Sequence, residues 1–201
     1  MKRWIAALVA ALGLQACAAT PPQVAETVVR IEANNAVCTG TFINTRGLVL
    51  TAGHCVAGEG TQVSIILRNG TTLVGTVTLD DDINDIALIR LDTPRQTVYS
   101  PLRCDTPAIA GEPVYIIGMP AGRRWVFTAG SVAGVIPVML ARMILLDMRI
   151  WFGNSGGGVF DQDGRIVGVV SMIMTYDRDK LTVIYGLAVP IKIVCDKVKN
   201  G

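Results

Sequence analysis

The sequence has little histidine, little charge and few aromatic residues. Its 201 residues include one histidine, His54, and only 17% are charged and 5% aromatic. An average soluble domain has ~25% charged residues, and here the net charge is +2 with scattered Lys and Arg, which argues against disorder and against nucleic-acid binding. Because C-x-x-C pairs are absent and one histidine cannot build a usual zinc site, we expect no metal ion and no other cofactor.

The N-terminus has the pattern of an export signal. Residues 1–3 carry two positive charges, and residues 4–14 form an uninterrupted run of apolar residues and glycine. This run is shorter than the ~20 residues of a membrane-spanning helix. The pattern therefore predicts that residues 1–16 are a signal peptide.

The end of this segment adds a lipid anchor to the prediction. Residues 14–17, LQAC, resemble the bacterial lipobox, which implies acylation of Cys17; an ordinary signal peptide with an incidental cysteine is the alternative. Residues 17–24 are then a tether. Ala18, where inner-membrane lipoproteins have aspartate, implies the periplasmic face of the outer membrane.

The rest of the chain is predicted to form short strands in two halves. Dipeptides such as Asn69-Gly70 between two runs indicate hairpin turns. The first half has runs at 26–31, 37–43, 47–50, 62–67, 72–79 and 85–91, and the second at 113–117, 126–132, 143–148, 157–160, 165–173 and 183–189. Residues 93–111 read as a linker and 191–198 as an amphipathic closing helix. Many short strands without helices between them indicate a sandwich or a barrel.

One segment admits a second interpretation. Residues 129–146 contain a single charge, Arg142, and are long enough to form a membrane-spanning segment. Gly130, Gly134 and Pro137 interrupt the segment, which favours two strands joined by an apolar connection.

The candidate chemistry lies in a glycine-rich turn and at the lone histidine. Residues 153–157, GNSGG, let the backbone turn tightly around Ser155, and a serine hydroxyl needs a neighbouring base, for which only His54 is available. No histidine follows Ser155 and no aspartate precedes His54, so the orders Ser-Asp-His and Asp-His-Ser are excluded. The remaining order is His, Asp, Ser.

Three segments in that order, TAGHC at 51–55, NDIAL at 84–88 and GNSGG, resemble the signature segments of trypsin-like serine proteases. The resemblance implies an all-β chymotrypsin-like fold of two six-stranded antiparallel barrels with a short C-terminal helix. It also selects Asp85 among four nearby aspartates as the acid beside His54 and Ser155. The backbone N–H groups of Gly153 and Ser155 are then expected to form an oxyanion hole.

The domain boundaries follow from this resemblance. The protease domain is expected over 25–201, with its N-terminal barrel at about 25–92 and its C-terminal barrel at about 112–190. Asn154, directly before the serine, and Asp147 resemble the bacterial HtrA/Deg group, here as a protease domain without the PDZ domain of those relatives.

The resemblance also implies the substrate-binding residues. Residues 168–171 are similar to the strand that pairs with an extended substrate, so Ser171 and Met172 are expected beside it, with Ser171 donating to Asp85. Arg149 occupies the expected floor of the primary pocket, where it would favour acidic side chains. The alternative is that Arg149 turns outward.

Apart from Cys17, four cysteines remain, and counting alone leaves three pairings open. The resemblance implies Cys38–Cys55, which brackets His54, and Cys104–Cys195.

Together these observations predict an exported, lipid-anchored serine endopeptidase acting on proteins or peptides, with its oligomeric state undetermined. Residues 151–152, Trp-Phe, replace the usual Asn-Pro, and Gly158 replaces a proline, which keeps an inactive binding module on the same fold as an alternative. An esterase using the same residues is a further alternative.

Overall fold

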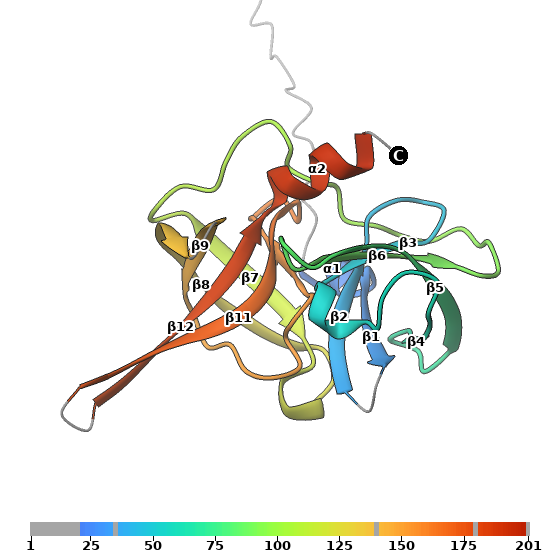
Figure 1. Ribbon diagram of the computed structural model, residues 1–201, viewed down its shortest axis with the longest axis horizontal. Helices are drawn as coiled ribbons and strands as arrows, with labels where there is room; N and C mark the ends of the chain where they lie inside the picture. Colours follow the sequence, from blue (N-terminus) through green and yellow to red (C-terminus); the bar gives the residue numbers. More distant parts are fainter. Residues whose placement is uncertain (1–20, 34–35, 139–140, 179–180, 200–201) are drawn as a thin grey trace, which may run out of the picture.

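Two closed antiparallel barrels stand side by side in the computed structural model, which describes residues 21–33, 36–138, 141–178 and 181–199 (Figure 1). The first barrel consists of β1 (Val28–Ala33), β2 (Ala36–Phe42), β3 (Leu48–Thr51), β4 (Gln62–Ile66), β5 (Thr72–Asp81) and β6 (Ile86–Leu91). The second consists of β7 (Pro113–Gly118), β8 (Val126–Val138), β9 (Ala141–Asp147), β10 (Gly158–Phe160), β11 (Ile166–Arg178) and β12 (Leu181–Pro190). The prediction of two six-stranded barrels is confirmed.

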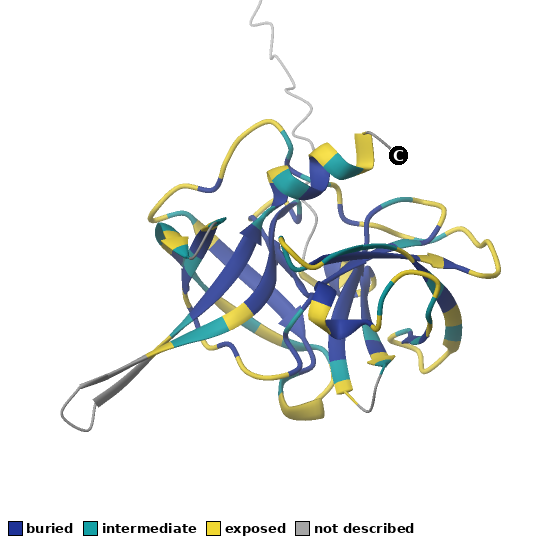
Figure 2. Ribbon diagram, viewed as in Figure 1, coloured by how far each residue is buried: buried dark blue, intermediate teal, exposed yellow. Residues whose placement is uncertain are grey.

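Both barrels have the same strand order. The neighbours run β1-β2-β3-β6-β5-β4 in the first and β7-β8-β9-β12-β11-β10 in the second. Buried residues run along the strands of both barrels (Figure 2). In β6 (Ile86–Leu91) successive side chains point to opposite sides: Ala87, Ile89 and Leu91 lie in the interior cluster of the first barrel, Ile86 and Leu88 lie in another buried cluster, and Arg90 is exposed. Each half therefore closes around its own apolar interior.

The apolar segment 129–146 lies in two paired strands. β8 extends to Val138 and β9 begins at Ala141, with Val138 opposite Ala141 in the register. Among the described residues, no helix has the length and apolar character needed to cross a membrane.

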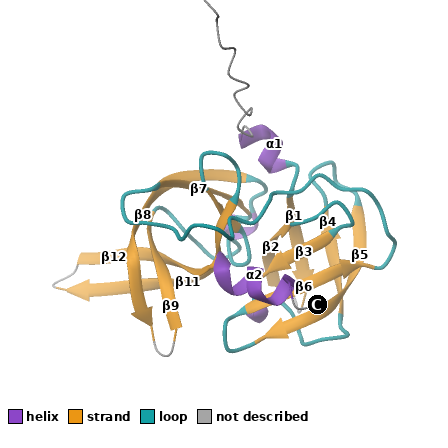
Figure 3. Cartoon of the chain, turned by 90° about the horizontal axis from the view of Figure 1, so that it is seen from above, coloured by secondary structure: helices purple, strands orange, loops and turns teal. Residues whose placement is uncertain are grey.

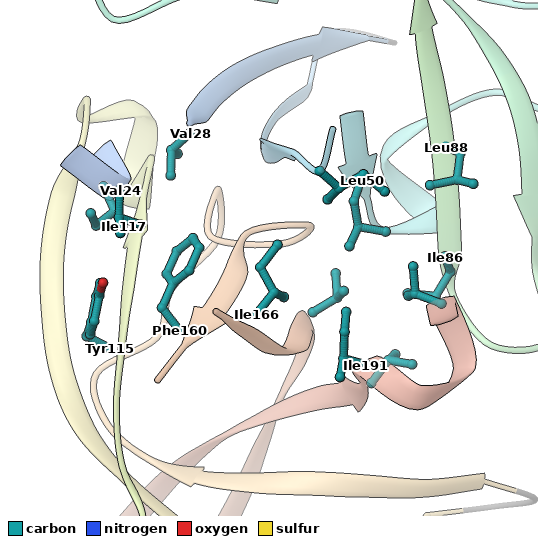
Figure 4. Packing of buried hydrophobic residues seen from close by; sticks show 14 of the residues in the cluster. Val24, Val28, Leu50, Ile86, Leu88, Tyr115, Ile117, Phe160, Ile166 and Ile191 are labelled. Carbon is teal, nitrogen blue, oxygen red and sulfur yellow. The ribbon is translucent and has the colours of Figure 1, made fainter. Parts of the chain in front are cut away.

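One apolar cluster is shared by the two barrels and joins them. Val28, Leu50 and Ile86 from the first barrel belong to one buried cluster with Phe160 and Ile166 from the second (Figure 4). Each barrel also has its own interior cluster. Because packed interiors resist deformation, this shared cluster fixes one barrel against the other.

Two helices cover the junction of the barrels (Figure 3). The closing helix α2 (Ile191–Lys199) agrees with the prediction and buries Ile191, Val194 and Cys195. The predicted tether 17–24 is wrong in its described part, because Pro21–Ala25 forms the short helix α1. Val24 is 2% exposed and packs into the shared cluster, since an apolar side chain gains more from burial than from a solvated tether.

Candidate active site

His54 follows β3 directly, in the short 3-10 helix η1 (Gly53–Cys55). Its ring Nδ1 lies 2.9 Å from Asp85 Oδ1 and 3.0 Å from Asp85 Oδ2. Because a carboxylate can only accept, Nδ1 carries a proton, and in the neutral imidazole Nε2 then has the free lone pair. The hydrogen bond to Asp85 raises the pKa of His54 above its ordinary value of 6.5, against the opposing effect of partial burial.

Asp85 is the aspartate of the 80–85 segment whose carboxylate meets His54. Its backbone has φ of 53°, a left-handed conformation that aspartate adopts more readily than most residues. Oδ1 also accepts the backbone N–H of His54 at 2.9 Å, and the Ser171 hydroxyl donates to Oδ2. Burial raises the pKa of the Asp85 carboxyl, but the hydrogen bonds from His54 and Ser171 outweigh it and hold the pKa below its usual range.

Ser155 lies in a turn whose glycines cannot be replaced by larger residues. Gly153 has φ of 98°, and a Cβ there would lie 2.1 Å from Met119 O. Gly156 has φ of 81°, and its Cβ would lie 2.1 Å from Thr51 Oγ1. The serine hydroxyl is partly buried and donates to Ser171 O at 3.4 Å.

The peptide before Gly153 has a fixed orientation. Phe152 O accepts the backbone N–H of Ala121, in the 3-10 turn η2 (Pro120–Gly122), at 2.8 Å. In a trans peptide the C=O and N–H groups point in opposite directions, so the N–H of Gly153 points away from Ala121. Within the described ranges this N–H has no hydrogen-bond acceptor.

The peptide before Ser155 is held in a similar way. Asn154 O accepts the backbone N–H of Gly157 at 3.0 Å, so the N–H of Ser155 points in the opposite direction. It too has no acceptor in the described part of the chain. The turn that carries Ser155 thus has two backbone donors without an acceptor among the described residues.

Thr39, on β2, connects the first barrel to this turn. The side chain is fully buried; its hydroxyl donates to Gly153 O at 2.6 Å and accepts the N–H of Met119 at 3.2 Å. Its backbone N–H donates to Ser155 O at 2.9 Å. One residue of the first barrel therefore fixes two loops of the second.

Ser171 owes its position to a β-bulge in β11. The register with β12 shifts between Val170 and Met172, which leaves Ser171 as the extra residue. A bulge redirects a side chain out of the regular alternation, and here the hydroxyl turns to Asp85. Pairing of β11 with β10 ends at Val169, so the edge beyond Val170 has no strand partner on that side in the described chain.

These residues surround one hollow of about 420 Å³, which we call the Ser155 hollow. Its lining includes His54, Asp85, Ile150, Trp151, Phe152, Ser155, Val170, Ser171, Met172 and Ile173. Apart from His54, Asp85, Ser155 and Ser171, the lining residues are apolar. Ile150 forms a buried part of this lining, which we call the floor; its Cδ1 packs on Gly186, where a Cβ would lie 2.1 Å away.

Of the two orientations that the sequence left open for Arg149, the structure has the outward one, and Arg149 does not form the floor of this hollow. Arg149 is exposed and is absent from the lining, whereas Met148 and Ile150 on either side are buried. Burial thus alternates along these three residues, with Arg149 on the outer side. Burial of an unpaired guanidinium would cost more than burial of isoleucine, and this decides which of the two faces inward.

Both expected disulfides are present. Cys38 joins Cys55 with a Cα–Cα distance of 6.1 Å, and Cys104 joins Cys195 at 5.8 Å. The first bond closes the loop that carries His54, and the second ties the interdomain linker to α2. Cys17 lies outside the described residues.

Comparison with known proteins agrees with this geometry. Residues 38–169 match the family model described as a trypsin-like peptidase domain. The chain belongs to the trypsin-like peptidase family. The match includes the segments around His54, Asp85 and Ser155.

Relatives of this trypsin-like domain are HtrA/Deg proteins. A probable periplasmic serine endoprotease DegP-like from Bartonella henselae is 30% identical over 140 residues, which are 68% of this chain and 28% of the relative. The mitochondrial serine protease HTRA2 of Bos taurus is 31% identical over 144 residues, 68% of this chain and 31% of the relative. A DegP-like protein from Rhizobium meliloti is 26% identical over 165 residues, 80% of this chain and 32% of the relative. The chain thus spans about a third of the length of these curated relatives.

Sequence reasoning missed several residues of the trypsin-like site. Ile150 could have been found from the alternation of Met148, Arg149 and Ile150. Thr39 gives no such signal, because its partner carbonyl lies 114 positions away in the chain.

Proposed function

We propose that this chain is a serine endopeptidase in which Ser155 is the nucleophile, His54 the general base and Asp85 the acid that orients the imidazole. The observation that carries the proposal is the His54–Asp85 pair facing a hollow that also contains Ser155. The tautomer with Nδ1–H on Asp85 supports it, because Nε2 is then free to take the serine proton.

The reaction proceeds through an acyl-enzyme. Ser155 Oγ turns from Ser171 O toward His54, forms a bond to the carbonyl carbon of the scissile peptide, and passes its proton to Nε2. The proton then moves to the departing amine as the C–N bond breaks. A water molecule attacks the resulting ester in the same way and restores the serine. Hydrogen bonds of this kind are often loose without substrate, so the absence of a Ser155–His54 bond in the described residues is compatible with this role.

The two unsatisfied backbone donors support an oxyanion hole. Phe152 O and Asn154 O are each held by another backbone N–H, which directs the N–H groups of Gly153 and Ser155 to the opposite side. Donors that are fixed before the reaction stabilise the developing negative charge without reorganising, and one such donor is worth about 10²–10³ in kcat. The change to Trp151-Phe152 thus does not argue for an inactive binding module.

The hollow favours an aliphatic side chain of the substrate. The floor at Ile150 and the walls at Met172 and Ile173 offer no charge to an acidic residue. The open edge of β11 beyond Val170 can pair with an extended peptide, as expected for a protein substrate. We therefore expect cleavage after medium-sized apolar residues.

A fluorophosphonate probe tests the enzyme proposal. Folded wild-type protein should be labelled on Ser155, and the Ser155→Ala variant should not. Absence of labelling in the folded wild type would support the inactive module and overturn the proposal. Casein hydrolysis separates an endopeptidase from an esterase, because an esterase would cleave small esters and leave casein intact.

Export and lipid anchoring are a separate part of the proposal. The N-terminal sequence and the resemblance of LQAC to a lipobox carry it, and two disulfides suit an oxidising compartment. Relatives named periplasmic endoproteases point to the same compartment. We expect Cys17→Ala to abolish labelling by radioactive palmitate and to move the protein from the outer membrane to the soluble periplasm; unchanged fractionation would contradict this.

A further inference from the structure

A second and larger hollow, of about 1170 Å³, lies at the end of β3 opposite to His54. The turn at 44–46, the segment 92–96 after β6 and the last turn of α2 line it, together with residues of β5 and β6. None of its lining residues belongs to the Ser155 hollow. We call it the basic hollow.

The charge of this hollow is strongly positive. Arg46, Arg90 and Arg95 line it, all three are exposed, and none forms an ion pair with any described residue. Asp92 is the acidic residue of the lining, and both of its carboxylate oxygens already accept side-chain hydrogen bonds, at 2.6 and 2.8 Å. Lys197 is also present but is paired with Asp81 at 2.6 Å. Three guanidinium groups are therefore free for a ligand.

The backbone under Arg46 is held rigidly. Asn44 Oδ1 accepts the N–H groups of Arg46 and Leu48 at 2.9 and 3.0 Å, which fixes the turn. Because the turn is ordered in advance, an anion that binds Arg46 has less entropy to remove from the protein.

The backbone near the other two arginines is anchored as well. The N–H and hydroxyl of Thr97 donate to the carbonyls of Thr45 and Asn44 at 3.1 and 2.9 Å, which ties the segment carrying Arg95 to the turn. Arg90 lies within β6, opposite residues of both β3 and β5. The three positions are thus set relative to one another by the fold.

Apolar side chains provide the other half of the surface. Leu48 and Leu79 are only partly buried where they line the hollow, and Val198 is 38% exposed on the last turn of α2. A ligand that matched the arginines alone would leave this apolar area in water. A segment carrying both carboxylates and aliphatic side chains matches both parts.

We propose that the basic hollow is a docking site for an acidic, leucine-rich segment of a partner protein. Carboxylates of the segment pair with Arg46, Arg90 and Arg95, and its aliphatic side chains cover the leucines. A nucleic acid or a sulfated polysaccharide would match the charge but has no aliphatic side chains for the apolar part. The site is separate from the serine chemistry, so binding does not depend on the proposed function.

Binding of a peptide to the disulfide-bonded Ser155→Ala chain tests this proposal without cleavage of the probe. The probe is a fluorescein-labelled peptide of alternating glutamate and leucine, measured by anisotropy. We expect Arg90→Gln/Arg95→Gln to weaken binding about tenfold, and added salt to weaken binding to the unaltered surface.

A matched control is available on another surface. Arg123 and Arg124 are exposed and without an ion pair among described residues, so Arg123→Gln/Arg124→Gln removes the same charge and should change the affinity by less than about twofold. A peptide of glutamate and serine should bind about tenfold more weakly than the leucine peptide, because it cannot cover the apolar part.

Three results would overturn the proposal. The first is an equal effect of the two double variants, which would mean attraction by net charge alone. The second is equal binding of the serine and leucine peptides. The third is that Arg90→Gln/Arg95→Gln binds heparin or anionic vesicles more weakly than the unaltered surface does, but binds the leucine peptide equally well. Unchanged melting temperatures of the variants exclude misfolding as the cause.

Discussion

Replacing Thr39 by valine removes one hydroxyl and almost no volume from the contact between the barrels. This hydroxyl donates to Gly153 O at 2.6 Å and accepts the N–H of Met119 at 3.2 Å, and all three residues are buried. Valine would leave a carbonyl and an N–H without partners. Each unsatisfied buried group costs about 1–3 kcal/mol, so the loss of both partners should lower the free energy of unfolding by roughly 2–6 kcal/mol.

The same substitution should lower the catalytic rate. Thr39 fixes the Gly153 carbonyl in the middle of the turn that presents the two backbone donors. Loosening this turn should reduce kcat by about tenfold to a hundredfold, below the 10²–10³ expected for complete loss of one donor. The KM should change little, because the hydroxyl does not line the Ser155 hollow.

Thr41→Val is the matched control. Thr41 lies on the same strand, is equally buried, and accepts the N–H of Gly158 at 3.2 Å, outside the 153–156 turn. It should lower stability, measured by chemical denaturation, but leave kcat unchanged when peptide hydrolysis is assayed well below both melting temperatures. If kcat falls equally in Thr39→Val and Thr41→Val, the role assigned to Thr39 is refuted.

Three further predictions follow from other contacts. The hydrogen bond to Asp85 raises the pKa of His54, so kcat/KM should increase with pH through a midpoint above 6.5. NMR titration of the single imidazole should show a lower midpoint in Asp85→Asn than in the wild type, and an unchanged midpoint would contradict this. Replacing Cys104 and Cys195 by alanine should lower the free energy of unfolding by about 2–4 kcal/mol in urea, and a loss within error would count against the bond. Arg103 is 7% exposed and bonds two carboxylates, so Arg103→Met should cost about 3–5 kcal/mol in the same assay, and a stable variant would show that the pairing contributes nothing.

The strands and their turns could be predicted because they depend on local pattern. The apolar run at 85–91 and the Asn69-Gly70 turn are properties of neighbouring residues, and β6 and the β4–β5 hairpin follow from them. Strand ends were less well predicted: β8 and β11 continue beyond the expected ends, because two neighbouring strands can pair outside the barrel. Local pattern does not report how far such pairing continues.

The sequence by itself determined the order of the reactive residues. One histidine that precedes every aspartate and Ser155 excluded two of the three commonest triad orders. It also limited the four cysteines to three pairings, although choosing among them needed the family resemblance.

Only the tertiary structure decided which groups meet at the site. Arg149 faces solvent and Ile150 lines the hollow, because an unpaired charge is costlier to bury than an aliphatic side chain. Thr39 meets Gly153 only after both barrels have closed and packed together. The basic hollow likewise combines a turn, a linker and a helix end that are distant along the chain. The contacts of Thr39 and of the basic hollow join residues dozens of positions apart, so no periodicity in the sequence can encode them.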